Sequence, residues 1–114
     1  MRKRIYYAII SLALFAPGSA MASSIEATGQ IARVYASYGG QYFGFRVFVK
    51  QNGADQLTAC SEHFAYINTG DANYQVKVDT LLTIYQMGRD AYLYISKDDS
   101  SGYCYITDVS SSSA

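Results

Sequence analysis

Tryptophan is absent from this 114-residue chain, and proline and histidine occur once each. A single histidine and two cysteines outside C-x-x-C spacing do not supply the ligand set of a common zinc site. The chain also lacks a phosphate-binding glycine loop and a G-x-S-x-G nucleophile elbow. We therefore expect no cofactor and no metal.

An apolar run long enough to cross a membrane is also missing. A spanning helix needs about 20 apolar residues, and the apolar stretch at residues 5–16 is shorter. Three basic residues precede it, and Ala20 and Ala22 fit the −3 and −1 positions of a cleavage site. We predict that residues 1–22 are a signal peptide and that the protein is exported, either to the periplasm or as a secreted protein. A retained membrane anchor is the less favoured alternative.

Charged residues are few, at 16% of the chain. Three of the nine basic residues lie before residue 22, so six remain against nine acidic ones, a formal charge near −3. This balance argues against nucleic acid or an anionic membrane surface as a partner. The chain after residue 22 suffices for one domain, which we place at residues 23–109, with a flexible tail at 110–114.

The two cysteines, Cys60 and Cys104, both lie beyond the predicted cleavage site. Two thiols of a small exported domain usually form a disulfide, because the compartment is oxidising. The loop between them would contribute roughly 3 to 4 kcal/mol by restricting the unfolded chain. Metal ligation and a redox pair are the weaker alternatives.

Strand patterns dominate the first part of the domain. Residues 30–38 and 41–50 are rich in β-branched and aromatic side chains, and the glycines at 39–40 predict a turn between them. Residues 57–60 predict a third strand after a turn at Asn52–Gly53. The second strand alternates, which predicts an inward face. That face consists of Phe43, Phe45, Val47 and Val49.

A helical period replaces this alternation at residues 73–87. Asp71 or Asn73 can cap the start of the helix, and Gly88 suits its end. The predicted inward residues are Tyr74, Val78, Leu81, Leu82 and Tyr85.

A final hairpin follows the helix. Residues 91–95 and 103–109 predict two strands, with a polar loop at 97–102. The order β-β-β-α-β-β predicts a mainly β domain with one helix, namely a small OB-like Greek-key barrel. A split sheet with the helix on one face is the alternative.

Tyrosine is in excess, with 12 in the chain. Four of them alternate along the last hairpin and are predicted to share its outer face: Tyr92, Tyr94, Tyr103 and Tyr105. Such a face is typical of a protein interface, or else of cross-strand aromatic pairs that stiffen the sheet. A second group could stack on a sugar ring, or consist of ordinary strand aromatics: Tyr35, Tyr38 and Tyr42.

Paired groups for acid–base catalysis are not evident, because the acidic residues are scattered at turns and helix ends. His63 lies close to Cys60, but a disulfide would consume the thiol. We therefore expect that the protein is not an enzyme.

Three segments carry a family likeness: Ala-Cys-Ser-Glu-His-Phe-Ala-Tyr at residues 59–66, the helix at 74–88 with its Met-Gly-Arg end, and Ala-Tyr-Leu-Tyr-Ile at 91–95. With the order of the elements, they give a chain that resembles the B subunits of AB5 toxins of the subtilase-cytotoxin and pertussis-like type, and related small exported bacterial proteins. This chain is shorter than those subunits, and its loop at 97–102 replaces a longer connection.

Those B subunits adopt an OB-fold, form rings of five and bind host glycans. The resemblance therefore implies an exported, non-enzymatic glycan-binding pentamer, with the segment around Thr28 as the nearest match to the family's glycan pocket. The alternative binding target is a protein partner. The alternative function is that of a monomeric periplasmic structural or inhibitor protein that binds another protein.

Overall fold

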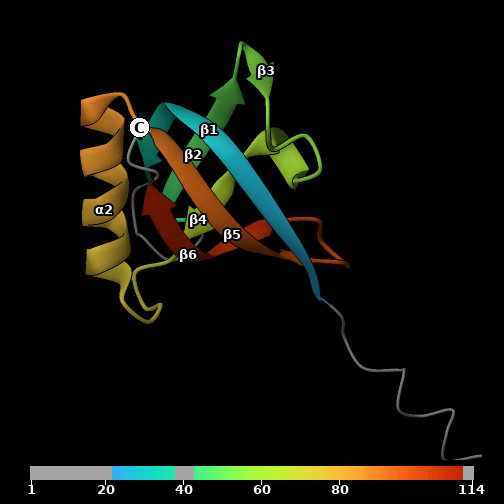
Figure 1. Cartoon of the computed structure of the whole chain (residues 1–114). Helices are drawn as coiled ribbons and strands as arrows, with labels where there is room; N and C mark the ends of the chain where they lie inside the picture. The colour runs from blue at the N-terminus through green and yellow to red at the C-terminus, as the bar shows by residue number, and fades with distance from the viewer. Residues whose placement is uncertain (1–21, 38–42, 112–114) are drawn as a thin grey trace, which may run out of the picture.

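A barrel of strands with one flanking α-helix makes up the described part of the computed structural model, which covers residues 22–37 and 43–111 (Figure 1). The strands are β1 (Ala22–Ala36), β2 (Phe45–Gln51), β3 (Ala54–Asp55), β4 (Ala65–Ile67), β5 (Asp90–Asp98) and β6 (Cys104–Ser111). A short 3₁₀ turn, η2 (Ser61–His63), precedes β4, and the helix α2 (Tyr74–Met87) connects β4 to β5. Residues 1–21, where most of the predicted signal peptide falls, lie outside the described residues.

The sheet closes on itself in the order β1-β5-β6-β4-β2, with β2 returning to β1 and β3 attached to the edge of β2. Every pairing is antiparallel except that of β4 with β6. A five-stranded closed barrel with its helix between the third and fourth barrel strands is the OB arrangement. The predicted OB-like Greek-key barrel is confirmed, and the split sheet is not formed.

Alternation along the strands fills the barrel. On β5, Ala91, Leu93 and Ile95 are buried while Tyr92 and Tyr94 face outward. On β2, the inward residues are Phe45, Val47 and Val49, as predicted. Phe43 departs from that prediction, because it precedes the strand and lies half-buried outside it. No polar or charged residue is buried within the described part of the chain.

The helix α2 ends at the predicted residue and begins one residue later than predicted, and its start is not capped as predicted. Asn73 adopts a left-handed conformation (φ 58°) and makes no side-chain capping bond. Asp71 does not cap the helix either, because its Oδ2 accepts a hydrogen bond from the backbone N–H of Asn68 at 2.6 Å. The end is as predicted: the N–H groups of Gly88 and Arg89 bond to carbonyls of the last turn, in a Schellman motif.

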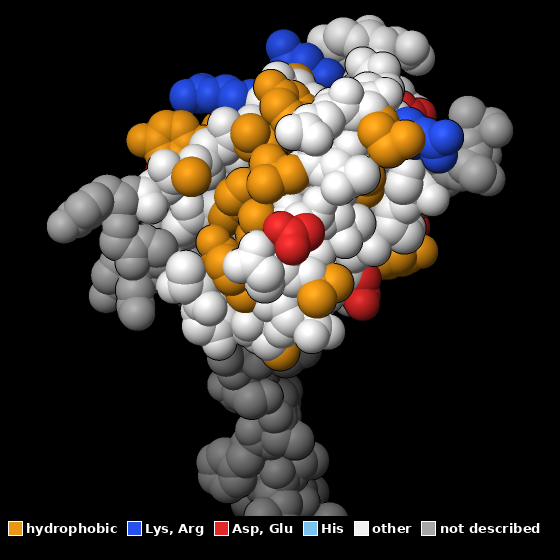
Figure 2. Space-filling view, turned by 90° about the vertical axis from the view of Figure 1, so that its left-hand side faces the viewer, with side chains coloured by type: hydrophobic (Ala, Val, Ile, Leu, Met, Phe, Trp, Pro, Cys, Tyr) orange, Lys and Arg blue, Asp and Glu red, His pale blue; other side chains and the backbone are white. Residues whose placement is uncertain are grey.

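The buried face of α2 consists of Val78, Leu81 and Ile84, with Leu82 partly buried. Tyr85 was predicted to point inward, but 40% of it is exposed. The buried residues follow one another at a spacing of three, so the face of the helix that contacts the barrel includes Ile84. Tyr85 lies beside this face. Figure 2 faces this side of the molecule and shows a band of hydrophobic side chains on its surface, broken by an acidic one.

The third barrel strand is not at residues 57–60, and that prediction was wrong. Leu57 and Cys60 are buried there, but the N–H of Cys60 bonds to the carbonyl of Leu57 in a turn. Two apolar residues three positions apart anchor a loop to the core, whereas a strand would alternate. The barrel strand is β4, eight residues later.

The strand β1 begins earlier than residue 30 and pairs with β5 along its whole first half, from Ala22 to Gln30. The strand β6 also extends beyond residue 109, because Ser110 and Ser111 pair with β5. The predicted turn at residues 39–40 lies outside the described residues. In the parts that are described, no helix is long and apolar enough to cross a membrane.

The predicted disulfide is confirmed: Cys60 and Cys104 are bonded, with Cα atoms 5.6 Å apart. The bond joins the loop before β4 to the first residue of β6. Those strands form the parallel pair of the barrel, which is only two residue pairs long. The disulfide therefore reinforces the shortest pairing of the closed ring.

Candidate functional site

A row of outward side chains crosses the barrel, one from each strand. Strand registers place Tyr35 of β1 beside Arg46 of β2, Arg46 beside Tyr66 of β4, Tyr66 beside Tyr105 of β6, and Tyr105 beside Ser96 of β5. Register partners point to the same side of a sheet. We call these five residues the transverse row. Because neighbouring strands lie about 4.8 Å apart, the part from Tyr35 to Tyr105 spans about 14 Å.

Aromatic rings pack around the middle of the row. The Phe43 ring lies 4.3 Å from that of Tyr103 and 4.5 Å from that of Tyr66, centroid to centroid. The ring of Phe64, which is 2% exposed, contacts the rings of both Phe43 and Tyr103. Tyr66 in turn lies 5.8 Å from Tyr105. Such packing holds the rings of the row in fixed orientations.

Backbone strain is concentrated beside these rings. Phe43 has a φ of 56°, and Glu62 and His63 have φ values of 57° and 61°. A positive φ is rare for a bulky residue. The Phe43 conformation is held by Asn68, whose Oδ1 accepts hydrogen bonds from the N–H groups of Phe43 (2.7 Å) and Gly44 (3.3 Å). Strain of this kind is typical of functional sites.

A shallow, open pocket of about 560 Å³ lies at the end of the row that consists of Tyr66, Tyr105 and Ser96. Its volume is in the range of small-molecule sites. The residues around it come from β1, β4, the loop before α2, β5 and β6: Ala22, Tyr66, Asn68, Asp71, Ser96, Asp98 and Tyr105. Ala22 is the last residue of the predicted signal peptide, so the predicted cleavage leaves the other six.

Two aromatic rings and two carboxylates give the pocket its chemistry. Asp98 is held by the hydroxyl of Ser101 (2.8 Å) and by the N–H of Ser100 (3.2 Å). These hydrogen bonds, that from Ser101 foremost, lower the pKa of Asp98 and keep it an ionised acceptor.

The tyrosine hydroxyls of the pocket differ in their surroundings. Burial, and then the charges of Asp71 and Asp98, raise the pKa of Tyr66, so its hydroxyl remains a proton donor at neutral pH. Tyr105 is covered by Lys77 of α2, whose Nζ lies 5.3 Å from the ring centroid and 3.4 Å from the carbonyl oxygen of Ile106.

The residues predicted to bind a sugar are only partly brought together. Tyr35 belongs to the transverse row and is 40% exposed. Thr28 lies half-buried beside Tyr92 on the β1–β5 pair and does not line the pocket. Tyr38 and Tyr42 lie outside the described residues.

The four hairpin tyrosines separate into two groups. Tyr105 belongs to the row, and Tyr103 packs against Phe43. Tyr92 and Tyr94 lie on β5, before Ser96, the residue that pairs with Tyr105. They are 37% and 42% exposed. Among the described rings, they make no contact with Tyr103 or Tyr105. A bulge in the β5–β6 register after Tyr94 contributes to this separation, because it inserts an extra residue in β6.

The row and the pocket contain five residues that were not predicted from the sequence as site residues: Arg46, Tyr66, Asn68, Asp71 and Asp98. Tyr66 was missed because β4 was not recognised as a strand, and Asp71 because it was read as a helix cap. An available signal was the Asn68–Asp71 pair, whose spacing is typical of a turn before a helix. The N–H of Asp71 bonds to the carbonyl of Asn68 at 2.9 Å.

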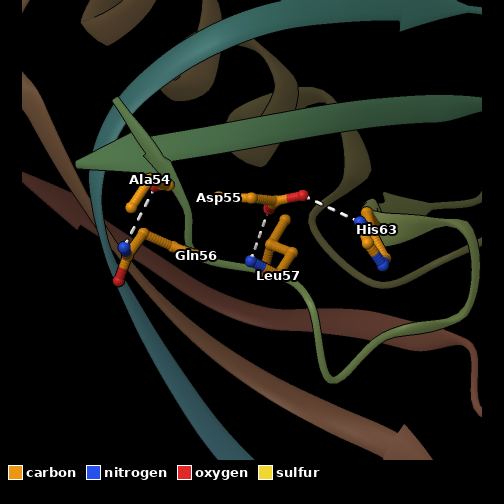
Figure 3. Close-up of polar contacts among 5 residues, drawn as sticks. All are labelled: Ala54, Asp55, Gln56, Leu57 and His63. Atoms are coloured by element: carbon orange, nitrogen blue, oxygen red, sulfur yellow. Dashed lines mark hydrogen bonds and ion pairs between the residues drawn. The ribbon is translucent and has the colours of Figure 1, made fainter. Parts of the chain in front are cut away.

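The single histidine has a structural partner (Figure 3). Its Nδ1 lies 2.9 Å from Asp55 Oδ2, while the other oxygen of Asp55 accepts a hydrogen bond from the N–H of Leu57 at 2.8 Å. The pair braces the loop between β3 and η2. Cys60 is in the disulfide, so it offers no thiol to His63. Within residues 22–37 and 43–111, no three His, Cys, Asp or Glu side chains form a metal-binding group.

No family model, curated protein or solved structure matches the chain. The likeness to the B subunits of AB5 toxins therefore stays a prediction from the sequence.

Proposed function

We propose that this protein is a non-enzymatic binding domain that recognises a glycan in the pocket of Tyr66 and Tyr105. The observation that carries the proposal is the combination of aromatic rings with fixed carboxylate and amide groups around one pocket. Sugars present hydroxyl groups, which donate to carboxylates, and apolar C–H faces, which pack on aromatic rings.

The location in the fold supports the same function. OB-folds bind oligosaccharides and oligonucleotides on the face of the second and third barrel strands, near two hairpin loops. Here those strands are β2 and β4. The transverse row crosses both of them, and β4 contributes Tyr66 to the pocket. Two carboxylates, Asp71 and Asp98, line the pocket, and one ammonium group, that of Lys77, lies over Tyr105. The negative charge is in excess, so a neutral sugar suits the pocket better than a nucleotide phosphate.

Binding without catalysis is the role that the acids support. A general acid needs a raised pKa, whereas the pKa of Asp98 is lowered by its hydrogen bonds. A protein partner is the second candidate, favoured by the exposure of Tyr92 and Tyr94 on β5.

A glycan array with the protein lacking residues 1–22 tests the proposal. Asp71→Asn keeps an oxygen for the N–H of Asn68 and removes the charge, and Tyr105→Ala removes one ring. We expect each to weaken glycan binding roughly tenfold or more. The matched control is Tyr85→Ala, an exposed tyrosine on α2 outside the pocket, which should leave binding unchanged. Binding to no glycan, or binding that survives both pocket variants, would overturn the proposal.

A further inference from the structure

Four side chains on the outer face of β1 and β2 form a two-by-two pattern. The register pairs Arg33 with Phe48 and Tyr35 with Arg46. Each arginine therefore has an aromatic neighbour both along its own strand and across to the next one. We call this group the arginine–aromatic square. It shares Tyr35 and Arg46 with the transverse row and lies at the end away from the pocket.

The rings fix the two guanidinium groups. Arg33 lies 5.4 Å from the ring centroid of Tyr35 and 5.1 Å from that of Phe48. Arg46 lies 4.9 Å from the centroids of both Tyr35 and Phe64, and its Nε donates to the carbonyl of Phe43 at 2.8 Å. Stacking uses the flat faces of the guanidinium groups and leaves most of their N–H edges available to an acceptor.

Among the described residues, neither arginine has a carboxylate partner. All nine Asp and Glu residues of the chain belong to the described residues. The ion pair found there joins Asp55 to His63 and involves no arginine. Glu62, near Arg46, gives its Oε2 to the hydroxyl of Tyr103. Two cations are thus held on one patch of a chain whose acidic residues outnumber its basic ones after residue 22.

We propose that Arg33 and Arg46 bind the oxyanion of an acidic glycan, a sulfate, carboxylate or phosphate group on a sugar unit other than the one in the pocket. Arginine presents paired N–H donors that match such oxygens. The pocket holds two carboxylates and the square two guanidinium groups, so each end of the row selects a different part of one ligand. Arg46 lies one strand from Tyr66 and Arg33 lies two strands away, about 10 Å, so a ligand that reaches from the pocket to Arg33 is longer than one sugar ring. This inference rests on the proposed function.

Calorimetry with matched dextran oligosaccharides, one sulfated and one unsulfated, tests the inference. We expect the wild-type protein to bind the sulfated form at least tenfold more tightly at low salt, and to lose most of this preference at high salt. Arg33→Gln should reduce the preference several-fold without changing affinity for the unsulfated form, and Arg46→Gln should reduce the preference by at least as much. Arg33 donates no side-chain hydrogen bond in the described structure, so its variant keeps the test valid if Arg46→Gln unfolds. Arg89→Gln is the control.

The outcomes separate this inference from the proposed function. Equal affinity for the two dextrans, or a sulfate preference that survives both arginine variants, overturns the inference and leaves glycan binding in the pocket standing. Inorganic sulfate that binds as tightly as the sulfated dextran overturns the extended ligand. Tighter binding of a single-stranded oligonucleotide overturns the assignment to a glycan. Sulfated-dextran binding that depends on Arg33 but not on Asp71 supports the anion site and contradicts the pocket.

Discussion

Gly29 lies where β1 changes partner from β5 to β2, and the backbones approach closely there. A Cβ at this position would lie 2.5 Å from the carbonyl oxygen of Lys50, and φ is +154°. Gly29→Ala should therefore destabilise the protein by roughly 2 to 4 kcal/mol, from overpacking and backbone strain together. Urea unfolding measures the loss.

Gly70→Ala is the matched control for that variant. A Cβ at Gly70 meets nothing within 4 Å. Its free energy of unfolding should stay within about 0.5 kcal/mol of the wild type, as for most surface changes. Equal stability of the two variants would contradict the close approach at Gly29.

Tyr66 carries the pH prediction at the residue scale. Its pKa is raised above the ordinary value by burial and by Asp71 and Asp98. The folded protein therefore holds this proton more tightly than the unfolded chain, and its stability falls as the pH rises from about 10 through the raised pKa. Absorbance near 295 nm should show that Tyr66→Phe removes a late-titrating phenol.

A control for that titration is needed because Tyr103 also has a raised pKa, owing to its hydrogen bond with Glu62. Comparing the variants Tyr66→Phe, Tyr103→Phe and their double assigns the two late phenols. If Tyr66→Phe removes a phenol with the ordinary pKa, Tyr66 does not feel the two carboxylates of the pocket.

The helix α2 provides a prediction at the scale of the element. Leu81 is fully buried against the barrel, so Leu81→Ala should cost about 2 to 5 kcal/mol. Val76 on the same helix is 62% exposed, and Val76→Ala should cost less than about 0.5 kcal/mol. Thermal or urea unfolding of both variants measures the difference. A loss at Leu81 no larger than at Val76 would place the wrong face of α2 against the core.

Long periodic elements could be predicted from the sequence, and short ones could not. The helix was predicted within one residue of its start because its period is repeated over several turns. The strand β4 has three residues, too few for alternation to show. The first half of β1 was missed because Ser23, Ser24 and Glu26 look like loop residues, although pairing with β5 makes them a strand.

The site was less predictable than the fold, since strand register creates it. Arg46, Tyr66 and Tyr105 are distant in sequence and become neighbours only because β2, β4 and β6 are adjacent in the barrel. Tyrosine excess indicated a binding surface, but not which tyrosines share it. One extra residue in β6 helps separate Tyr94 from Tyr105.

At the scale of the whole molecule, two exposed apolar surfaces of the described residues suit self-association. One is β5, with Tyr92 and Tyr94. The other is α2, with Val76 and Met87, 62% and 58% exposed (Figure 2). If β5 forms the predicted oligomer interface, Tyr92→Ser with Tyr94→Ser should yield a monomer in sedimentation experiments, because the exposed rings supply its apolar contact.

The double variant Val76→Ser with Met87→Ser is the comparison. If this double variant dissociates the oligomer and the β5 double variant does not, the interface is formed by α2. A wild-type protein that is monomeric at high micromolar concentration would contradict the predicted ring.

The pairing of β1 with β5 also determines when the chain can fold as it emerges. The side chain of Ser23 donates to Asp99, 76 residues later. A polypeptide leaving a ribosome or a translocation channel with its amino end first therefore cannot pair the first half of β1 until nearly the whole domain is outside. Until then, β1 has only β2 as a partner, and β2 can also pair with β3 and β4. The chain therefore stays incompletely folded during passage. The edge of β1 that pairs with β5 is exposed until β5 has emerged.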